Sequence, residues 1–214
     1  MWALQGPFFC SSYPSYDLIW SAVIFVVLFI LWQTLAPIYE QLATVFAGEK
    51  SVVIAKVDAT EDGDLASKYG VSGYPTIKFF PAGESEATDY SGGRDIKDLV
   101  EFINSQVGTS RNVDGTLVET AGRVAELDSI IEASKGSWDA AFASAIADAA
   151  GKLEGSSKDF GKLYVAAANK VVAKGVSYVS TESKRLENMA KSGSVNPEQR
   201  TNFQLRINIL RAFA

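Results

Sequence analysis

The residues that most often carry thiol or acid–base chemistry are nearly absent from this chain. It has one cysteine, Cys10, and no histidine among its 214 residues. Thiol–disulfide exchange within one copy needs an attacking thiolate and a second, resolving thiol, and histidine is the most common general base. A single copy can therefore neither cycle a dithiol nor use histidine catalysis. Cysteine and histidine are also the usual ligands of transition metals, so the sequence predicts no metal site and no cofactor.

Composition narrows the classes of protein and of partner that remain possible. The hydrophobic fraction of 47% is enough for packed cores, and the length allows one or two domains. The net charge is −5 and the isoelectric point is about 4.9, and no run of Lys or Arg reverses this locally. An acidic chain repels the phosphate backbone, so nucleic acid is excluded as an expected partner.

An apolar block occupies residues 18–32, from Leu18 to Trp32, with a single break at Ser21. Its length falls between the length typical of a membrane-spanning helix and that of a core segment. Three interpretations stay open: a membrane anchor, a buried strand, or an apolar tail with no evolved role. The strand is favoured by β-branched and aromatic residues over 23–27, and fully buried strands read as continuous apolar runs.

The elements that would position a site follow this block. The hydrophobic pattern predicts an order of helix, strand, helix, strand, strand and helix. The first helix spans 35–46, with Pro37 near its start and Gly48 as a stop signal. The other elements are expected as a largely buried strand over 52–57, a short helix over 64–69, a strand over 76–80, an edge strand over 87–90 and an amphipathic helix over 95–107.

Four motifs occur along this segment in a fixed order. They are Leu35-Ala36-Pro37-Ile38-Tyr39-Glu40, Ala55-Lys56-Val57-Asp58-Ala59-Thr60, Tyr69-Gly70-Val71-Ser72-Gly73-Tyr74-Pro75-Thr76 and Tyr90-Ser91-Gly92-Gly93-Arg94. Together they resemble the thioredoxin-like catalytic domain of protein disulfide isomerases, over about its last two-thirds. The resemblance implies an incomplete α/β thioredoxin-like fold whose central strand either comes from residues 22–28 or is missing.

The resemblance also identifies what the chain lacks. In the family, a Trp-Cys-Gly-His-Cys stretch shortly precedes the Leu-Ala-Pro motif. Alignment on Leu35 places the two family cysteines at Phe29 and Trp32, so the catalytic residues are expected to be absent. Cys10 lies far upstream of these positions and outside any Cys-x-x-Cys, where we expect no working redox residue.

Other site residues are carried over by the same resemblance. Pro75 matches a cis proline beside the family cysteines, and Tyr74 and Thr76 flank it where backbone contacts peptide substrate. Arg94 matches an arginine that modulates cysteine protonation, although a solvated loop arginine is the simpler interpretation in a chain without those cysteines. Two further interpretations concern residues outside this group. Tyr39 and Glu40 are expected on a helix surface, and Lys56 with Asp58 is either a family remnant or a local ion pair or turn.

A polar, glycine-containing segment, 108–116, is predicted to link the α/β part to an all-helical region. Four or five helices are expected there, because apolar residues recur at helical spacing. One helix is expected to run from the stripe at 163–172 as far as Ala190, and Asn196-Pro197-Glu198-Gln199 is a start signal for the last. The stripes are Val124, Leu127, Ile130 and Ile131; Trp138, Ala141, Phe142, Ala145 and Ile146; Leu163, Tyr164, Ala167, Val171 and Val172; and Phe203, Ile207, Leu210 and Phe213.

Three motifs mark this helical region: Lys184-Arg185-Leu186-Glu187-Asn188-Met189, Asn196-Pro197-Glu198 and Arg206-Ile207-Asn208-Ile209-Leu210. They resemble the C-terminal domain of the endoplasmic reticulum protein 29 type, found after thioredoxin modules in some plant and protist disulfide isomerases. The resemblance implies unfolded or secretory client proteins as partners and the endoplasmic reticulum, lumen or membrane, as location. The chain ends without a Lys-Asp-Glu-Leu retrieval signal.

The sequence therefore predicts four segments: an atypical apolar segment, 1–33; a partial thioredoxin-like domain, 34–107; a linker, 108–116; and a separate all-α bundle, 117–214. The expected function is that of a disulfide isomerase relative without its redox dithiol, which binds peptides or acts as a scaffold. Two alternatives are an active disulfide isomerase that uses Cys10 or a partner's thiols, and an unstable product of an alternative or misannotated first exon.

Overall fold

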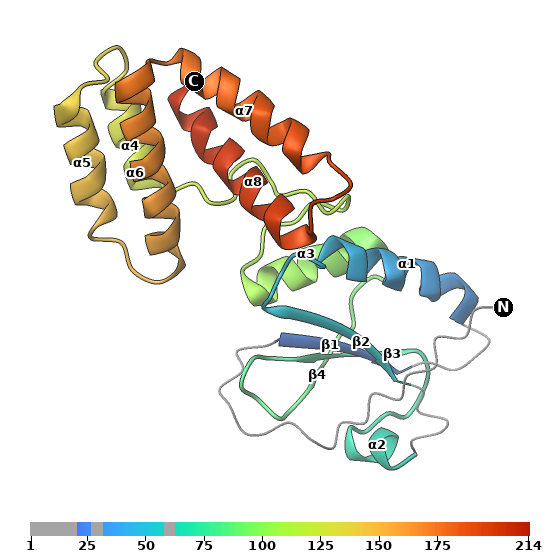
Figure 1. Ribbon diagram of the computed structural model, residues 1–214. Coiled ribbons are helices and arrows are strands. Elements are labelled where there is room, and N and C mark those ends of the chain that lie inside the picture. The colour runs from blue at the N-terminus through green and yellow to red at the C-terminus, as the bar shows by residue number, and fades with distance from the viewer. Residues whose placement is uncertain (1–20, 27–31, 58–62) are drawn as a thin grey trace.

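The sheet is built around β1 (Ser21–Val26), whose β-branched and aromatic residues favour extended backbone. The structure is a computed structural model that describes residues 21–26, 32–57 and 63–214. β1 pairs in parallel with β2 (Val52–Val57) and antiparallel with β3 (Thr76–Phe80), which in turn pairs with β4 (Thr88–Asp89). The order is β2-β1-β3-β4, so β1 lies in the interior of the sheet (Figure 1).

This placement decides among the interpretations of the apolar block. The strand interpretation is confirmed over Ser21–Val26, and the membrane-helix interpretation is wrong for these six residues. Residues 18–20 and 27–31 of the block lie outside the described residues. Among the helices of the described ranges, none combines the length and the apolar character needed to cross a membrane.

Two helices cover one face of the sheet, α1 (Trp32–Val45) and α3 (Ile96–Val107), while the short α2 (Gly63–Lys68) lies toward the other side (Figure 1). α3 begins at the Asp95 cap, whose carboxylate accepts from the Asp98 backbone N–H, and ends at Gly108 with φ of 73°. The core between helices and sheet contains Leu35, Tyr39, Leu42, Val45, Phe46, Val52, Ile77, Phe79, Leu99, Val100 and Ile103.

Several predicted boundaries and exposures need correction. α1 starts three residues earlier than expected, so Pro37 lies inside the helix and not near its start. In β2 only Val52 is fully buried, because this strand pairs with β1 alone among the described strands and so lies at the sheet edge. β4 has two residues, where the sequence predicted four over 87–90.

The helical region contains five α-helices, as expected, within residues 117–214: α4 (Ala125–Ala133), α5 (Ala140–Ala150), α6 (Ser156–Lys174), α7 (Ser177–Ala190) and α8 (Pro197–Leu210). A 3₁₀ turn, Arg211–Phe213, follows. The core contains Leu127, Ile131, Phe142, Ile146, Ala149, Ala150, Tyr164, Ala167, Ala168, Val171, Val179, Leu186, Ile207, Ile209, Leu210 and Phe213.

The start of α8 confirms the predicted signal, with a capping box between Asn196 and Gln199 and Pro197 as the first residue. The expected continuous helix to Ala190 is wrong. Gly175, with φ of 78°, separates α6 from α7 and donates its N–H to the Val171 carbonyl. The predicted inward alanines of α5, Ala141 and Ala145, are exposed.

A polar group inside the bundle gives a stability prediction. The fully buried Tyr164 donates its hydroxyl to Asp128 Oδ1 at 2.6 Å, and burial and this carboxylate raise its pKa above the ordinary 10.0. We expect Tyr164→Phe to lower the free energy of unfolding by about 1–3 kcal/mol at pH 8, because Asp128 loses a donor.

The same substitution has a predicted pH dependence. Above about pH 10 the unfolded-state tyrosine ionises while the folded one does not, so the wild type loses stability as pH rises. Phenylalanine cannot ionise, so the difference in free energy of unfolding between wild type and Tyr164→Phe should become smaller as pH rises. Urea unfolding at pH 8 and 10.5 measures both effects, and a constant difference between these pH values would contradict the raised pKa.

Candidate functional site

The carried-over site residues lie where β1 and β3 run side by side. Val26, the last residue of β1, pairs with Thr76, the first residue of β3. Pro75 is buried immediately before this pair, and the Tyr74–Pro75 peptide bond is cis, as the sequence predicts. The start of β3 therefore holds Tyr74, Pro75 and Thr76 at the end of the interior strand.

Hydrogen bonds define the turn that leads into β3. Thr76 Oγ1 donates to the Gly73 carbonyl at 2.6 Å, across the proline. Ser72 and Gly73 are exposed and Tyr74 is half-buried, so the backbone just ahead of Pro75 faces solvent.

Arg94 joins this group from the loop before α3. Its Nη2 donates to the Pro75 carbonyl at 3.3 Å, although the two residues are 19 positions apart. The side chain is exposed, which agrees with a solvated loop arginine, but the sequence did not predict the hydrogen bond. Arg94 thus contacts the backbone of the site and places a positive charge at its rim.

The two family cysteine positions, 29 and 32, follow the end of β1 in the chain. Position 32 is Trp32, the first residue of α1, and Phe29 lies outside the described residues. No group of three or more Cys, Asp or Glu side chains within the described ranges is placed to hold a metal ion. The described part of the site offers solvent-exposed backbone ahead of Pro75 and one cation, the guanidinium of Arg94.

Tyr39 is a residue that sequence reasoning misplaced. It was expected on the surface of α1, yet it is buried, and its hydroxyl donates to the Ala55 carbonyl of β2. Burial raises its pKa far above the ordinary value. This bond fixes α1 against the sheet and so positions the helix start at Trp32. Glu40 is exposed as expected; Asp58 lies outside the described residues.

A second feature lies on the helical region. A hollow of about 630 Å³ is walled by the segment after α3, through Thr116 and Glu119, and by α7, α8 and their ends, through Glu187, Arg200, Gln204 and Arg211. Its lining mixes cationic, anionic and amide side chains. No local pattern in the sequence predicts this hollow, because its two walls are about 70 to 100 residues apart in the chain.

Two family models match the chain. The thioredoxin model matches residues 32–105, and the model of the endoplasmic reticulum protein ERp29, C-terminal domain, matches residues 122–213. The rice (Oryza sativa subsp. japonica) protein named protein disulfide isomerase-like 2-2 is 44% identical over 183 residues, which cover 84% of this chain and 49% of the rice protein. This chain is similar over most of its length to proteins named protein disulfide isomerase.

A second curated relative and one solved structure are also similar to parts of this chain. The Medicago sativa protein named probable protein disulfide-isomerase A6 is 43% identical over 185 residues, or 85% of this chain and 50% of that protein. A solved structure of human ERp44 is 31% identical over 42% of this chain and 28% of its own, with a TM-score of 0.38. The chain spans about half the length of the curated relatives it matches. The predicted thioredoxin-like domain followed by a helical ERp29-type domain is confirmed.

Proposed function

We propose that this chain serves protein folding in the endoplasmic reticulum by binding unfolded or secretory polypeptides, and that a single copy does not itself exchange thiols and disulfides. One observation carries the proposal. The Tyr74–Thr76 turn and its Arg94 contact are present, while Phe29 and Trp32 stand at the positions aligned with the reactive cysteines. The scaffold for holding a peptide is retained without the residues that would react with it.

The chemical part of this proposal follows from the mechanism of exchange. A thiolate attacks a disulfide, and a second thiol then resolves the mixed disulfide. Cys10 can supply at most one of these thiols, and neither Phe nor Trp can replace the other. The rival function, active exchange through Cys10 or a partner's thiols, is supported only by the names of the relatives, of which this chain matches about half.

The binding part of the proposal uses two surfaces. The exposed turn ahead of Pro75 offers backbone groups to an extended client, and Arg94 adds a cation that can pair with client carboxylates or carbonyls. The hollow of about 630 Å³ on the helical domain offers a second contact. The ERp29-type domain and the named relatives support the endoplasmic reticulum as the location.

Two assays on the full chain test the two parts separately. In an insulin-reduction assay, wild type and Cys10→Ser should both stay at the uncatalysed rate. A wild-type rate above that of Cys10→Ser would contradict the redox part. In a binding assay, a fluorescently labelled, reduced and unfolded polypeptide should increase in anisotropy when the chain is added, and no increase would contradict client binding.

Arg94→Ala gives a residue-level prediction for the same binding assay. We expect it to weaken client affinity about two- to fivefold, because the Pro75 carbonyl loses its donor and the rim loses its charge. The matched control is Arg185→Ala, which removes an exposed arginine of α7 that pairs with Glu182. Equal affinities for the two variants would contradict a binding role for Arg94.

A further inference from the structure

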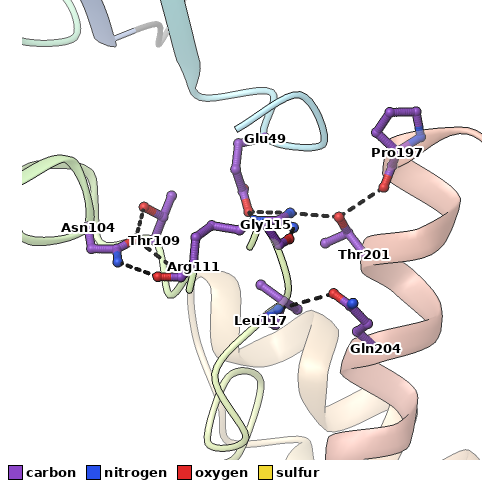
Figure 2. Close-up of polar contacts among 9 residues, drawn as sticks. All are labelled: Glu49, Asn104, Thr109, Arg111, Gly115, Leu117, Pro197, Thr201 and Gln204. Atoms are coloured by element: carbon purple, nitrogen blue, oxygen red, sulfur yellow. Dashed lines mark hydrogen bonds and ion pairs between the residues drawn. The ribbon is translucent and has the colours of Figure 1, made fainter. Parts of the chain in front are cut away.

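The most heavily bonded buried cation among the described residues lies between the two domains. Arg111 is only 5% exposed, and every nitrogen of its guanidinium donates a hydrogen bond (Figure 2). Nε and Nη2 both lie 2.7 Å from Glu49 Oε1. Nη1 donates to the Gly115 carbonyl at 2.8 Å, and Nη2 donates to Thr201 Oγ1 at 2.6 Å.

These three partners come from three separate parts of the chain. Glu49 follows α1 in the thioredoxin-like domain, 62 positions from Arg111, and Thr201 belongs to α8, 90 positions away. Gly115 lies in a hydrogen-bonded hairpin that includes the Arg111–Leu117 bridge. A guanidinium is a rigid planar fork, so all three acceptors must keep their places for the bonds to persist. A charge this deeply buried is costly without them.

The backbone of Arg111 is held as firmly as its side chain. Asn104, near the end of α3, accepts the Arg111 N–H at 3.0 Å and donates to the Arg111 carbonyl at 2.8 Å. The same Asn104 oxygen accepts from Thr109 Oγ1 at 2.8 Å. The predicted linker, 108–116, is therefore tied to the end of α3 by the hydrogen bonds of Asn104 and is not a loose tether. The residue that follows the linker bonds to α8, because the Leu117 N–H donates to Gln204 Oε1 at 3.1 Å.

Gly48 shows how closely the two domains approach. A Cβ at this position would lie 2.6 Å from Thr201 Oγ1 and 2.9 Å from the Pro197 carbonyl oxygen. The second atom is backbone, so α8 itself would have to move. The nearby Lys50–Glu198 ion pair, at 2.7 Å, is exposed on both sides and contributes little. The contact depends on the close approach of Gly48 and on Arg111.

We propose that this junction, made of Gly48, Glu49, Asn104, Arg111, Gly115 and Thr201, locks the thioredoxin-like and helical domains in one orientation. The two domains then move as a single rigid body. The hairpin that carries Gly115 also supplies Thr116 to the hollow on the helical domain, and Glu119, just after the hairpin, lines it as well. The junction thus holds this hollow at a constant distance from the Pro75 turn. This inference does not depend on the proposed function.

Distance measurements on the full chain test the junction. Spin labels are attached to Lys97→Cys in α3 and Lys184→Cys in α7, both exposed, in a Cys10→Ser background. Double electron–electron resonance should give one narrow distance distribution. Gly48→Ala and Arg111→Lys should each at least double its width, since the first wedges the domains apart and the second removes the planar fork.

Gly193→Ala is the matched control, because a Cβ there meets nothing within 4 Å, and it should leave the distribution unchanged. Thr201→Val removes one acceptor with little change of shape and keeps the test informative if Arg111→Lys folds poorly. A broad distribution in the parent protein would overturn the proposal. A narrow distribution that survives in Gly48→Ala and in Thr201→Val would overturn it as well.

Discussion

The double substitution Phe29→Cys with Trp32→Cys should raise the insulin-reduction rate of this chain about tenfold or more over wild type. Residue 32 begins α1, so the new pair would have Cys-x-x-Cys spacing at a helix N-terminus, which favours the thiolate. Val26, the last residue of β1, precedes both positions in the chain. Its pairing with Thr76 places the end of β1 next to the turn at Pro75. The start of α1 and the turn at Pro75 would then surround the new thiols, and no other part of the site would change.

The controls for this gain of activity are the two single substitutions, each in a Cys10→Ser background. Each leaves one thiol near the site and should stay at the uncatalysed rate, because no partner resolves the mixed disulfide. Circular dichroism establishes that the double variant keeps its helix content. A folded double variant without a gain in rate would show that Phe29 and Trp32 do not occupy the cysteine positions.

Ile24→Pro should destabilise the thioredoxin-like domain by more than about 3 kcal/mol, or unfold it. Ile24 pairs with Ala55 on one side and with Lys78 on the other, and proline cannot donate to a ladder. In a membrane helix the same substitution is better tolerated. Urea unfolding followed by near-ultraviolet circular dichroism measures the loss.

Glu86→Pro is the comparison for this strand, because Glu86 is exposed and lies outside the helices and strands. We expect it to change the free energy of unfolding by less than about 0.5 kcal/mol. Equal stabilities of Ile24→Pro and wild type would show that β1 does not lie in the interior of the sheet. They would also contradict the strand interpretation of the apolar block.

Local signals predicted much of this molecule. β2 and β3 have the predicted bounds, because β-branched and aromatic runs ended by turn residues are specified by neighbours in the chain. The Asn196 capping box is likewise a property of four consecutive residues. Pro75 and Thr76 were placed by a motif whose members are contiguous. Features that depend on a few adjacent residues could be predicted from the sequence.

Features that depend on distant partners could not be predicted. Tyr39 resembled a surface residue beside the apolar stripe of α1, and only the Ala55 carbonyl of β2 explains its burial. Arg111 lies in a polar segment that looked like a solvated linker, and its partners are 62 and 90 positions away. Gly48 was read as a helix stop, whereas α1 ends at Val45 and the glycine is required by the approach of α8. For these residues the composition of the neighbouring chain carries no signal.

The span of the Arg111 contacts has a consequence for how the chain is made. Domains generally fold in turn as they leave the ribosome, from the N-terminal end. The sheet is complete once β4 has emerged, but Thr201 lies 90 positions after Arg111, in the last α-helix of the described residues. During synthesis the finished first domain therefore carries Arg111 without one of its acceptors. If the junction sets the orientation of the two domains as proposed, that orientation can form only after α8 has been released.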